Sequence, residues 1–160
     1  MRQNILITGA SSGLGEGMAR EFAQMGRNLI ICARRVDRLE ALASELRAQF
    51  PEIRIVLLAM DVTLPEDVSR AFLAAHRLFP QIDRIIVNAG CGGAEPLGVG
   101  SVEAAVQVAQ TNFVGAVIQC HEAMRIFRQQ GAGHLVTVSS VSAVRGMPGG
   151  MATYSASKAA

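Results

Sequence analysis

The feature that most constrains the fold of this sequence is an alternation of short apolar runs with longer segments of helical periodicity. Five runs, each four to seven residues long, are rich in Ile, Leu and Val, and this length is typical of strands. They cover residues 4–8, 28–33, 54–60, 85–88 and 134–139. Because the runs are apolar almost throughout, we expect parallel strands that are covered on both faces.

The segments between these runs carry apolar residues at helical spacing. Leu39, Leu42 and Leu46 share one helical face, and a long helical pattern extends from Val102 to about Gln130. Right-handed crossovers through such helices give five strands the order 3-2-1-4-5. The sequence therefore predicts an α/β fold with a doubly wound, Rossmann-type parallel sheet. Ligands of such sheets bind at the carboxyl ends of strands 1 and 4.

Residues 1–160 are expected to form a single domain. The last segment, Tyr154–Ala160, reads as the first turns of another helix with no stop signal, so we expect the C-terminal part of a larger fold to be missing. The formal net charge of +2 disfavours a nucleic acid or an acidic membrane surface as partner. The first apolar run is too short for a signal peptide, and no run reaches the roughly 18 residues that cross a bilayer. These features favour a soluble, cytoplasmic protein.

A glycine-rich turn, TGASSGLG from Thr8 to Gly15, follows the first predicted strand and opens a helix that extends to about Met25. Glycines in such a turn let the backbone approach a diphosphate, and the helix N-terminus favours the anion. The alternative is an ordinary glycine-rich connection between a strand and a helix. No Gly-Lys-Ser/Thr follows, which excludes a P-loop kinase or GTPase. The turn therefore predicts a dinucleotide site.

Two arginines, Arg34 and Arg35, stand at the end of the second predicted strand, where NAD-binding folds carry an acidic residue for the ribose 2′-hydroxyl. Guanidinium groups instead bind a 2′-phosphate through charge-assisted hydrogen bonds. We therefore expect NADP(H) to be preferred, with NAD(H) as the alternative. Asp37 argues for NAD(H), but its position after the arginines favours a helix cap. The arginines could equally be a solvated surface pair.

The only tyrosine, Tyr154, stands four residues before the only lysine, Lys158. On a helix this spacing places both side chains on one face. A cation beside a phenol stabilises the phenolate form, which makes the phenol a better proton donor at neutral pH. The pair therefore predicts proton exchange with a carbonyl or alcohol oxygen. The alternative is a surface tyrosine that packs on the lysine stem.

The cysteines and histidines give no sign of a metal site. Cys32, Cys91 and Cys120 are widely spaced without a CxxC pair, and the three histidines lack partners at ligand spacing. We expect the cysteines to act as small hydrophobic residues, although Cys91 follows the fourth strand near the expected cleft. No metal is expected.

Six motifs in the same order closely resemble those of the classical short-chain dehydrogenases/reductases. They are TGASSGLG (8–15), Asp61-Val62, Asn88-Ala89-Gly90, Asn112-Phe-Val-Gly115, Ser139-Ser140 and Tyr154-Ser-Ala-Ser-Lys158. The resemblance covers nearly the whole chain. The sequence departs from the family pattern in two ways. Tyr154 stands 14 residues after Ser140, one residue more than is common in the family. The chain is also shorter than usual family members.

This resemblance implies roles for individual residues. Tyr154 would be the catalytic acid/base, Lys158 would support it and bind the nicotinamide ribose, Ser140 would polarise the substrate oxygen, and Asn112 would hold a water in a proton relay. Around the cofactor, the family pattern implies binding by Gly9, Ser11, Ser12, Gly13, Leu14, Gly15, Arg34, Arg35, Asp61, Val62, Asn88, Ala89 and Gly90, together with Tyr154 and Lys158.

The sequence thus predicts an oxidoreductase that moves hydride reversibly between NADP(H) and a secondary alcohol or ketone of small size. The family resemblance implies a homodimer or homotetramer formed through the long helix and the helix at Tyr154. The alternative is a non-catalytic dinucleotide-binding sensor or scaffold protein, which would have no need for the Tyr154 and Lys158 pair. A methyltransferase on a similar sheet is disfavoured for the same reason.

Overall fold

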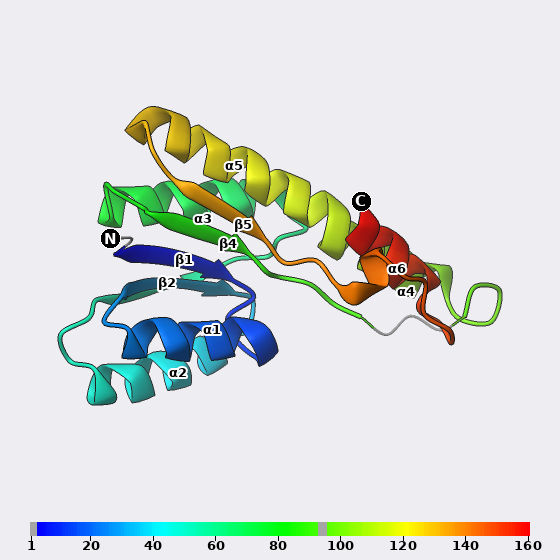
Figure 1. Cartoon of the computed structure of the whole chain (residues 1–160), viewed down its shortest axis with the longest axis horizontal. Coiled ribbons are helices and arrows are strands. Elements are labelled where there is room, and N and C mark those ends of the chain that lie inside the picture. Colours follow the sequence, from blue (N-terminus) through cyan, green and yellow to red (C-terminus); the bar gives the residue numbers. More distant parts are fainter. Residues whose placement is uncertain (1–2, 93–95) are drawn as a thin grey trace.

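The computed structural model describes residues 3–92 and 96–160 of the chain and is centred on a five-stranded parallel sheet (Figure 1). The strands are β1 (Asn4–Thr8), β2 (Asn28–Ala33), β3 (Ile55–Ala59), β4 (Arg84–Val87) and β5 (His134–Thr137). Their order, β3-β2-β1-β4-β5, confirms the predicted topology. The first two strands have the predicted bounds, β3 and β4 differ from the prediction by one residue at each end, and β5 ends two residues earlier than predicted.

Helices cover both faces of this sheet. Helices α1 (Gly13–Gln24) and α2 (Val36–Gln49) lie on one face, and α3 (Pro65–Leu78) and α5 (Gly115–Gln130) lie on the other (Figure 1). Consecutive side chains of a strand point to opposite faces. Accordingly, Ile5 and Ile7 of β1 join the core under α1 and α2, whereas Leu6 joins the core under α3 and α5. This double coverage explains the uninterrupted apolar runs in the sequence.

The predicted long helix from Val102 to Gln130 is interrupted in its hydrogen-bonding pattern. It begins as α4 (Val102–Ala109), passes through a π-helical turn at Gln110–Val114 and continues as α5. Each turn of a π-helix holds more residues than an α-helical turn. Thr111 and Asn112, which lie in this π turn, are both buried. The interruption therefore changes which side chains of the helix face the rest of the protein.

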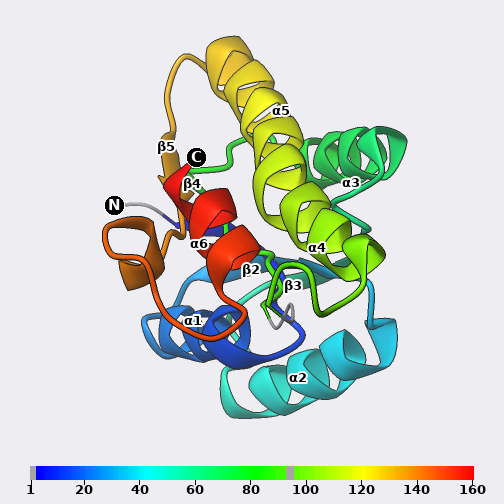
Figure 2. The ribbon, with the colours of Figure 1, turned by 90° about the vertical axis from the view of Figure 1, so that its right-hand side faces the viewer.

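A projecting part of the molecule extends beyond the carboxyl ends of the strands (Figure 1). It contains α4, the described residues just before it, the segment that follows β5 with a short 3₁₀ turn at Val141–Ala143, and α6 (Ala152–Ala159). Figure 2 shows α6 and α4 next to each other in front of the sheet. In the described parts of the chain, no helix combines the length and the apolar character needed to cross a membrane.

The N-terminal turns of α1 pack closely against the turn after β1. A Cβ atom added to Gly15 would lie 2.7 Å from Nδ2 of Asn88 and would also overlap the carbonyl of Gly9. By contrast, a Cβ atom added to Gly17, two residues along the same helix, would meet no atom within 4 Å. Gly15 therefore sets how near α1 can approach the sheet.

We expect Gly15→Ala to lower the free energy of unfolding by about 1–3 kcal/mol, because the helix must shift away from β1 and β4. Urea denaturation followed by circular dichroism measures this change. Gly17→Ala is the matched control and should stabilise the protein by up to about 1 kcal/mol, because alanine is the better helix former. Equal effects of the two substitutions would contradict the close packing.

Candidate active site

A cleft of about 580 Å³ lies at the carboxyl ends of the strands. It is lined by the turn after β1, the ends of β2 and β3, the segments that follow β4 and β5, and the start of α6. The described residues that line it include Gly9, Ser11, Ser12, Gly13, Leu14, Arg34, Arg35, Asp61, Val62, Asn88, Ala89, Gly90, Ser140, Tyr154 and Lys158. Most of the predicted site residues therefore meet in one place.

Two polar side chains join β1 to β4 at the floor of the cleft. The Thr8 hydroxyl, which is fully buried, accepts hydrogen bonds from the backbone N–H groups of Asn88 and Ala89, both at 3.1 Å. The Asn88 side chain donates in return to the Thr8 carbonyl at 2.9 Å. These bonds fix the two strands where the strand order reverses, which is where ligands of doubly wound sheets bind.

The turn after β1 has the backbone conformation that its glycines allow. Gly9 has φ of +67°, and a Cβ atom there would lie 2.7 Å from the Cα atom of Ala89. Gly13 starts α1, lines the cleft and faces open space. The turn can therefore bring backbone N–H groups and a helix N-terminus to an anion. Gly15 does not line the cleft, because it faces the carbonyl of Gly9 and the Asn88 side chain.

Arg35 and Arg34 occupy different positions in the cleft. Arg35 donates hydrogen bonds to the hydroxyl oxygens of Ser11 at 3.0 Å and Ser12 at 2.7 Å, so it ties the end of β2 to the glycine-rich turn. Arg34 is largely exposed, and its Nη1 lies 3.7 Å from Oδ2 of Asp61. The two arginines therefore differ in what they can do: Arg35 supports the turn, and Arg34 has a guanidinium free to reorient toward a ligand.

Asp61 is held in its ionised form. Burial opposes its charge, but hydrogen bonds from the backbone N–H and the hydroxyl of Thr63, with the nearby Arg34 guanidinium, outweigh that effect and lower the pKa of Asp61 below its ordinary value. Asp37, which the sequence suggested as a helix cap, instead lies inside the first turn of α2. Asp61 is thus the carboxylate that lines the cleft beside the arginines.

Tyr154 and Lys158 lie one turn apart on α6, and both line the cleft. The ammonium of Lys158 donates to the backbone carbonyl of Val138 at 3.0 Å, and a Cβ atom added to Gly90 would lie 3.2 Å from its Nζ. The ring of Tyr154 lies against Gly92, where an added Cβ atom would be 3.6 Å from the ring. The absence of a side chain at Gly90 thus leaves room for the Lys158 ammonium, whereas Gly92 stands at an ordinary contact distance from the Tyr154 ring.

Ser140 follows β5 and stands before the 3₁₀ turn. Its hydroxyl oxygen accepts a hydrogen bond from the backbone N–H of Ser142 at 3.1 Å, which leaves the hydroxyl proton available for another acceptor. Ser142 also lines the cleft. The preceding Ser139 donates to the carbonyl of Lys158 at 2.8 Å and thereby joins the end of β5 to α6.

Asn112 does not line this cleft but lies behind it in the π turn. Its side-chain amide donates to the carbonyl of Cys91 at 2.7 Å and to the hydroxyl of Ser157 at 3.1 Å. Its side-chain oxygen accepts from the N–H of Cys91 at 2.8 Å. Ser157 donates in turn to the carbonyl of Tyr154 at 2.7 Å. Asn112 therefore links the segment after β4 to the helix of Tyr154, and its role as a water ligand stays a prediction.

The sequence reasoning missed Thr8 and Ser157 as supporting residues. Both stand inside motifs that it singled out, the glycine-rich turn and the Tyr154 to Lys158 segment. Their contacts join distant segments, so no local spacing could have assigned them.

The three cysteines differ in their burial. Complete burial raises the pKa of the Cys32 thiol to about 12, and partial burial also raises the pKa of Cys120. Cys91 lines the cleft and is half-buried. Within residues 3–92 and 96–160, no three His, Cys, Asp or Glu side chains gather as metal ligands would.

Comparisons with known proteins agree with this geometry. A family model described as short chain dehydrogenase matches residues 3–160. An uncharacterized oxidoreductase of Mycobacterium tuberculosis is 50% identical over 158 residues, which are 99% of this chain and 62% of that protein. The chain thus spans less than two thirds of this relative's length.

Two solved structures are similar over almost the whole chain. One is levodione reductase, with a TM-score of 0.92, 28% identity and coverage of 99% of this chain and 62% of that one. The other is an alcohol dehydrogenase from the archaeon Thermococcus sibiricus complexed with 5-hydroxy-NADP, with a TM-score of 0.88, 31% identity and coverage of 98% and 65%. Both exceed this chain in length.

Because the pKa of Asp61 is lowered in the folded protein, its carboxylate stabilises the fold above the ordinary pKa of 3.8 and loses this effect as the pH falls below that value. We expect Asp61→Asn to cost about 1 kcal/mol of unfolding free energy at pH 7. The difference from the wild type should shrink in urea titrations below pH 3.8. Thr63→Val, which removes one donor to Asp61, should give a smaller loss with the same pH dependence. A pH-independent loss would contradict this account.

Proposed function

The chain belongs to the short-chain dehydrogenase/reductase family, and we propose that its protein is an NADP(H)-dependent oxidoreductase acting on a secondary alcohol or ketone. The observation that carries this proposal is the meeting of Ser140, Tyr154 and Lys158 with the glycine-rich turn in one cleft. A protein that only binds a dinucleotide has no need for the first three side chains.

The residues of the cleft fit a nicotinamide dinucleotide. Gly13 faces open space at the N-terminus of α1, where a diphosphate could approach the backbone. Asp61 and Val62 follow β3 and line the same cleft as Asn88, Ala89 and Gly90, which follow β4. In this proposal the former pair contacts the adenine, and the latter three lie beneath the nicotinamide ribose. When bound, the coenzyme supplies or accepts the hydride.

The chain's own residues would then donate the proton that the substrate oxygen needs. In the reduction direction the Ser140 hydroxyl donates a hydrogen bond to the substrate carbonyl oxygen, and the Tyr154 hydroxyl transfers its proton to that oxygen as the carbonyl carbon receives hydride. The product is the neutral alcohol, and Tyr154 is left as a phenolate. The Lys158 ammonium stabilises this phenolate electrostatically. Asn112 positions the segments on either side of this group through its contacts with Cys91 and Ser157.

The preference for NADP(H) rests on the two arginines at the end of β2. Arg34 is exposed and can bring a guanidinium to an adenosine 2′-phosphate, which it would bind more strongly than a neutral ribose hydroxyl. Similar structures include both an alcohol dehydrogenase complexed with 5-hydroxy-NADP and an NAD+-bound xylitol dehydrogenase, so the arginines alone carry this choice. NAD(H) is the second coenzyme in this proposal.

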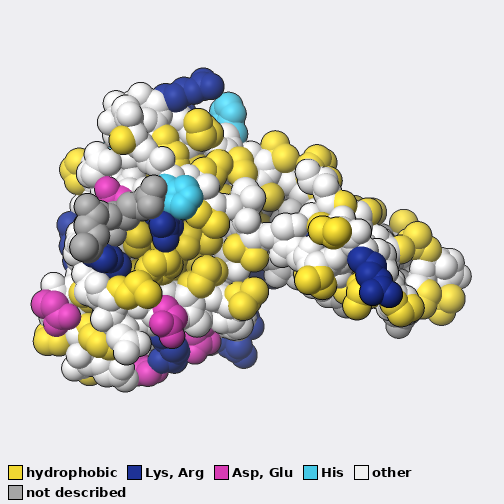
Figure 3. All heavy atoms as spheres, in the orientation of Figure 1, with side chains coloured by type: hydrophobic (Ala, Val, Ile, Leu, Met, Phe, Trp, Pro, Cys, Tyr) yellow, Lys and Arg dark blue, Asp and Glu magenta, His cyan; other side chains and the backbone are white. Residues whose placement is uncertain are grey.

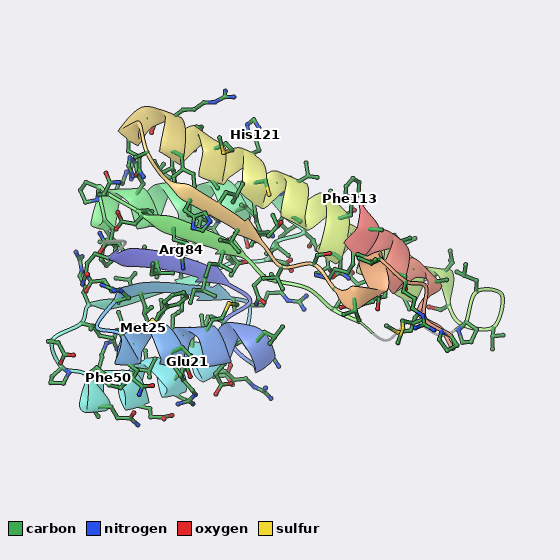
Figure 4. The ribbon with its side chains drawn as sticks, in the orientation of Figure 1. Glu21, Met25, Phe50, Arg84, Phe113 and His121 are labelled. Carbon is green, nitrogen blue, oxygen red and sulfur yellow. The ribbon has the colours of Figure 1, made fainter. Side chains whose placement is uncertain are left out.

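We also propose that the protein assembles as a homodimer or homotetramer through α4, α5 and α6. The large apolar side chains that are exposed along α4, the π turn and α5 are Val102, Val106, Phe113, Val114, Val117 and Met124. Figure 4 shows Phe113 and His121 on the side of the helix that faces away from the sheet. Exposed apolar side chains that gather on one surface can mark a protein–protein interface.

Tyr154→Phe removes only the hydroxyl that would transfer the proton. We expect it to reduce kcat by at least about 100-fold, as is typical when a general acid is lost. The dissociation constant for NADPH should stay within about twofold, because a phenyl ring fills the same space. Stopped-flow absorbance and NADPH fluorescence titration measure the two quantities. Substantial residual turnover would remove the assignment of Tyr154.

Arg34→Ala and Arg35→Ala should separate coenzyme choice from support of the glycine-rich turn. Loss of a charge-assisted hydrogen bond costs about 1.5–3 kcal/mol, so Arg34→Ala should weaken NADPH about 10-fold to 100-fold and leave NADH nearly unchanged. Arg35→Ala should weaken both coenzymes, because Ser11 and Ser12 lose their common donor. Titration of both coenzymes against each variant tests this. Unchanged NADPH affinity in Arg34→Ala would defeat the proposed preference.

A further inference from the structure

We propose that Ser157 is a positioning residue of the reaction, because it links the helix of Tyr154 to the segment after β4 through Asn112. The link would keep the proton donor at a fixed distance from the coenzyme that this segment is proposed to contact. The inference rests on the proposed oxidoreductase function and adds to it a residue that does not line the cleft. The structural basis is a continuous set of hydrogen bonds from Cys91 to Tyr154.

The Ser157 hydroxyl is buried and makes two hydrogen bonds. The residue is 8% exposed, its oxygen accepts from the Asn112 amide at 3.1 Å, and its hydrogen is donated to the Tyr154 carbonyl at 2.7 Å. A serine in a helix often bonds to a carbonyl of the preceding turn. The contact with Asn112 is different, because it joins α6 to the π turn at Gln110–Val114, and the two residues are 45 positions apart in the chain.

Asn112 extends this link to the segment after β4. Its side chain lies in a residue that is 4% exposed, its oxygen accepts from the N–H of Cys91, and its amide donates to the Cys91 carbonyl. The amide also donates to Ser157, so both of its hydrogens are used. Removal of the Ser157 hydroxyl would leave one of them in a buried position without its acceptor. Such an unpaired donor is unfavourable, so neighbouring groups are expected to move to meet it.

The segments joined by this link also meet at Gly90. A Cβ atom added there would lie 3.1 Å from the side-chain oxygen of Asn112 and 3.2 Å from Nζ of Lys158. The ring of Tyr154 lies against Gly92, where an added Cβ atom would be 3.6 Å from the ring. Two side chains of α6 therefore face the segment after β4, and a shift of the helix changes the distance of both from it.

Helix α6 belongs to the part of the molecule that projects beyond the sheet, as the space-filling view shows (Figure 3). Two neighbouring residues of α6 bind to different elements at the base of this part. Lys158 donates to the carbonyl of Val138, which follows β5, and Ser157 accepts from Asn112 in the π turn. Loss of the second contact would leave α6 attached to the end of β5 but less firmly held against the segment after β4.

Tyr154 and Lys158 are carried by the same helix, so a shift of α6 moves them together. Their separation stays one helical turn, and the influence of the ammonium on the phenol should not change. The distance from the Tyr154 hydroxyl to a substrate held by Ser140 and the coenzyme does change. A misplacement of about 1 Å can cost about 100-fold in rate. Loss of the Ser157 hydroxyl should therefore slow proton transfer and leave its pH dependence as it was.

Ser157→Ala in the full-length protein tests this proposal. We would measure the reduction of cyclohexanone, acetophenone and 2-octanone with NADPH and compare kcat for the ketone that the wild type reduces fastest. We expect kcat to fall about 10-fold to 100-fold. The dissociation constant for NADPH should stay within about twofold, because Ser157 does not line the cleft. The pH at which kcat changes should be the same as in the wild type.

Gln130→Ala is the control for a loss of stability alone. Gln130 ends α5 at the opposite end from α6 (Figure 1), and its side chain bonds to the N–H of Ile82 at 3.2 Å and to its carbonyl at 2.6 Å. This variant should unfold at a lower urea concentration than the wild type and keep kcat within about twofold. If Ser157→Ala does not fold, Ser157→Cys replaces it, because a thiol of similar size is a weaker donor and acceptor and should lower kcat by a smaller factor.

A double substitution tests whether Ser157 acts through Asn112. Rates would be measured in single-turnover experiments, which also follow slow variants. In the presence of Asn112→Ala the link is already broken, so Ser157→Ala should change the rate by less than about twofold. The same factor with and without Asn112→Ala would show an independent effect and would overturn the proposal.

The possible results separate this inference from the function beneath it. If Tyr154→Phe loses turnover and Ser157→Ala keeps kcat within about twofold, the inference is wrong and the oxidoreductase function stands. The inference is equally wrong if Ser157→Ala shifts the pH dependence of kcat, or if Gln130→Ala lowers kcat as much. If the wild type reduces none of the three ketones and oxidises none of the corresponding alcohols, the proposed function fails and the inference fails with it.

Discussion

The hydrogen bonds between Thr8 and Asn88 are the interaction on which the rest of the site depends. β1 continues toward β2 on one side of the sheet, and β4 continues toward β5 on the other, so the connections after these strands diverge. A gap between diverging connections can bind a ligand only if its two sides keep a fixed separation. The buried Thr8 hydroxyl and the Asn88 amide hold that separation with three short contacts. The glycine-rich turn and the segment before Cys91 both start where these hydrogen bonds link β1 to β4.

Most of the sheet could be predicted from the sequence, because burial of a strand restricts which residue types it can contain. A strand that is covered on both faces must be apolar at nearly every position, and the runs around Leu6 and Ile30 meet that demand. The same holds for the glycine-rich turn, where Gly9 needs a left-handed conformation and a close approach to Ala89. In both cases the requirement, burial or a left-handed backbone conformation, restricts the residue type at that position. The structural feature can therefore be predicted from the local sequence.

The parts that could not be predicted depend on contacts between distant segments. The pattern from Val102 to Gln130 is helical throughout, and one π turn shifts it too little to break the apparent periodicity. That shift nevertheless determines that Asn112 faces Cys91 and Ser157 and not the cleft. Likewise, nothing near Arg35 in the sequence indicates that its partners are Ser11 and Ser12, because that contact exists only once β1 and β2 are paired.

Under the proposed function, the basic residues of the cleft suit the chemistry at each end. Fourteen of the fifteen basic residues are arginine, and the single lysine is Lys158. A planar guanidinium suits phosphate oxygens and hydroxyl pairs, as at Arg35, because it presents several donors in a fixed plane. A compact ammonium suits the position beside Tyr154, because it can turn its donors to a carbonyl and still place its charge near the phenol. Arginine at position 158 would occupy the space above Gly90 with a larger, flat group, so the two ends of the cleft require different cations.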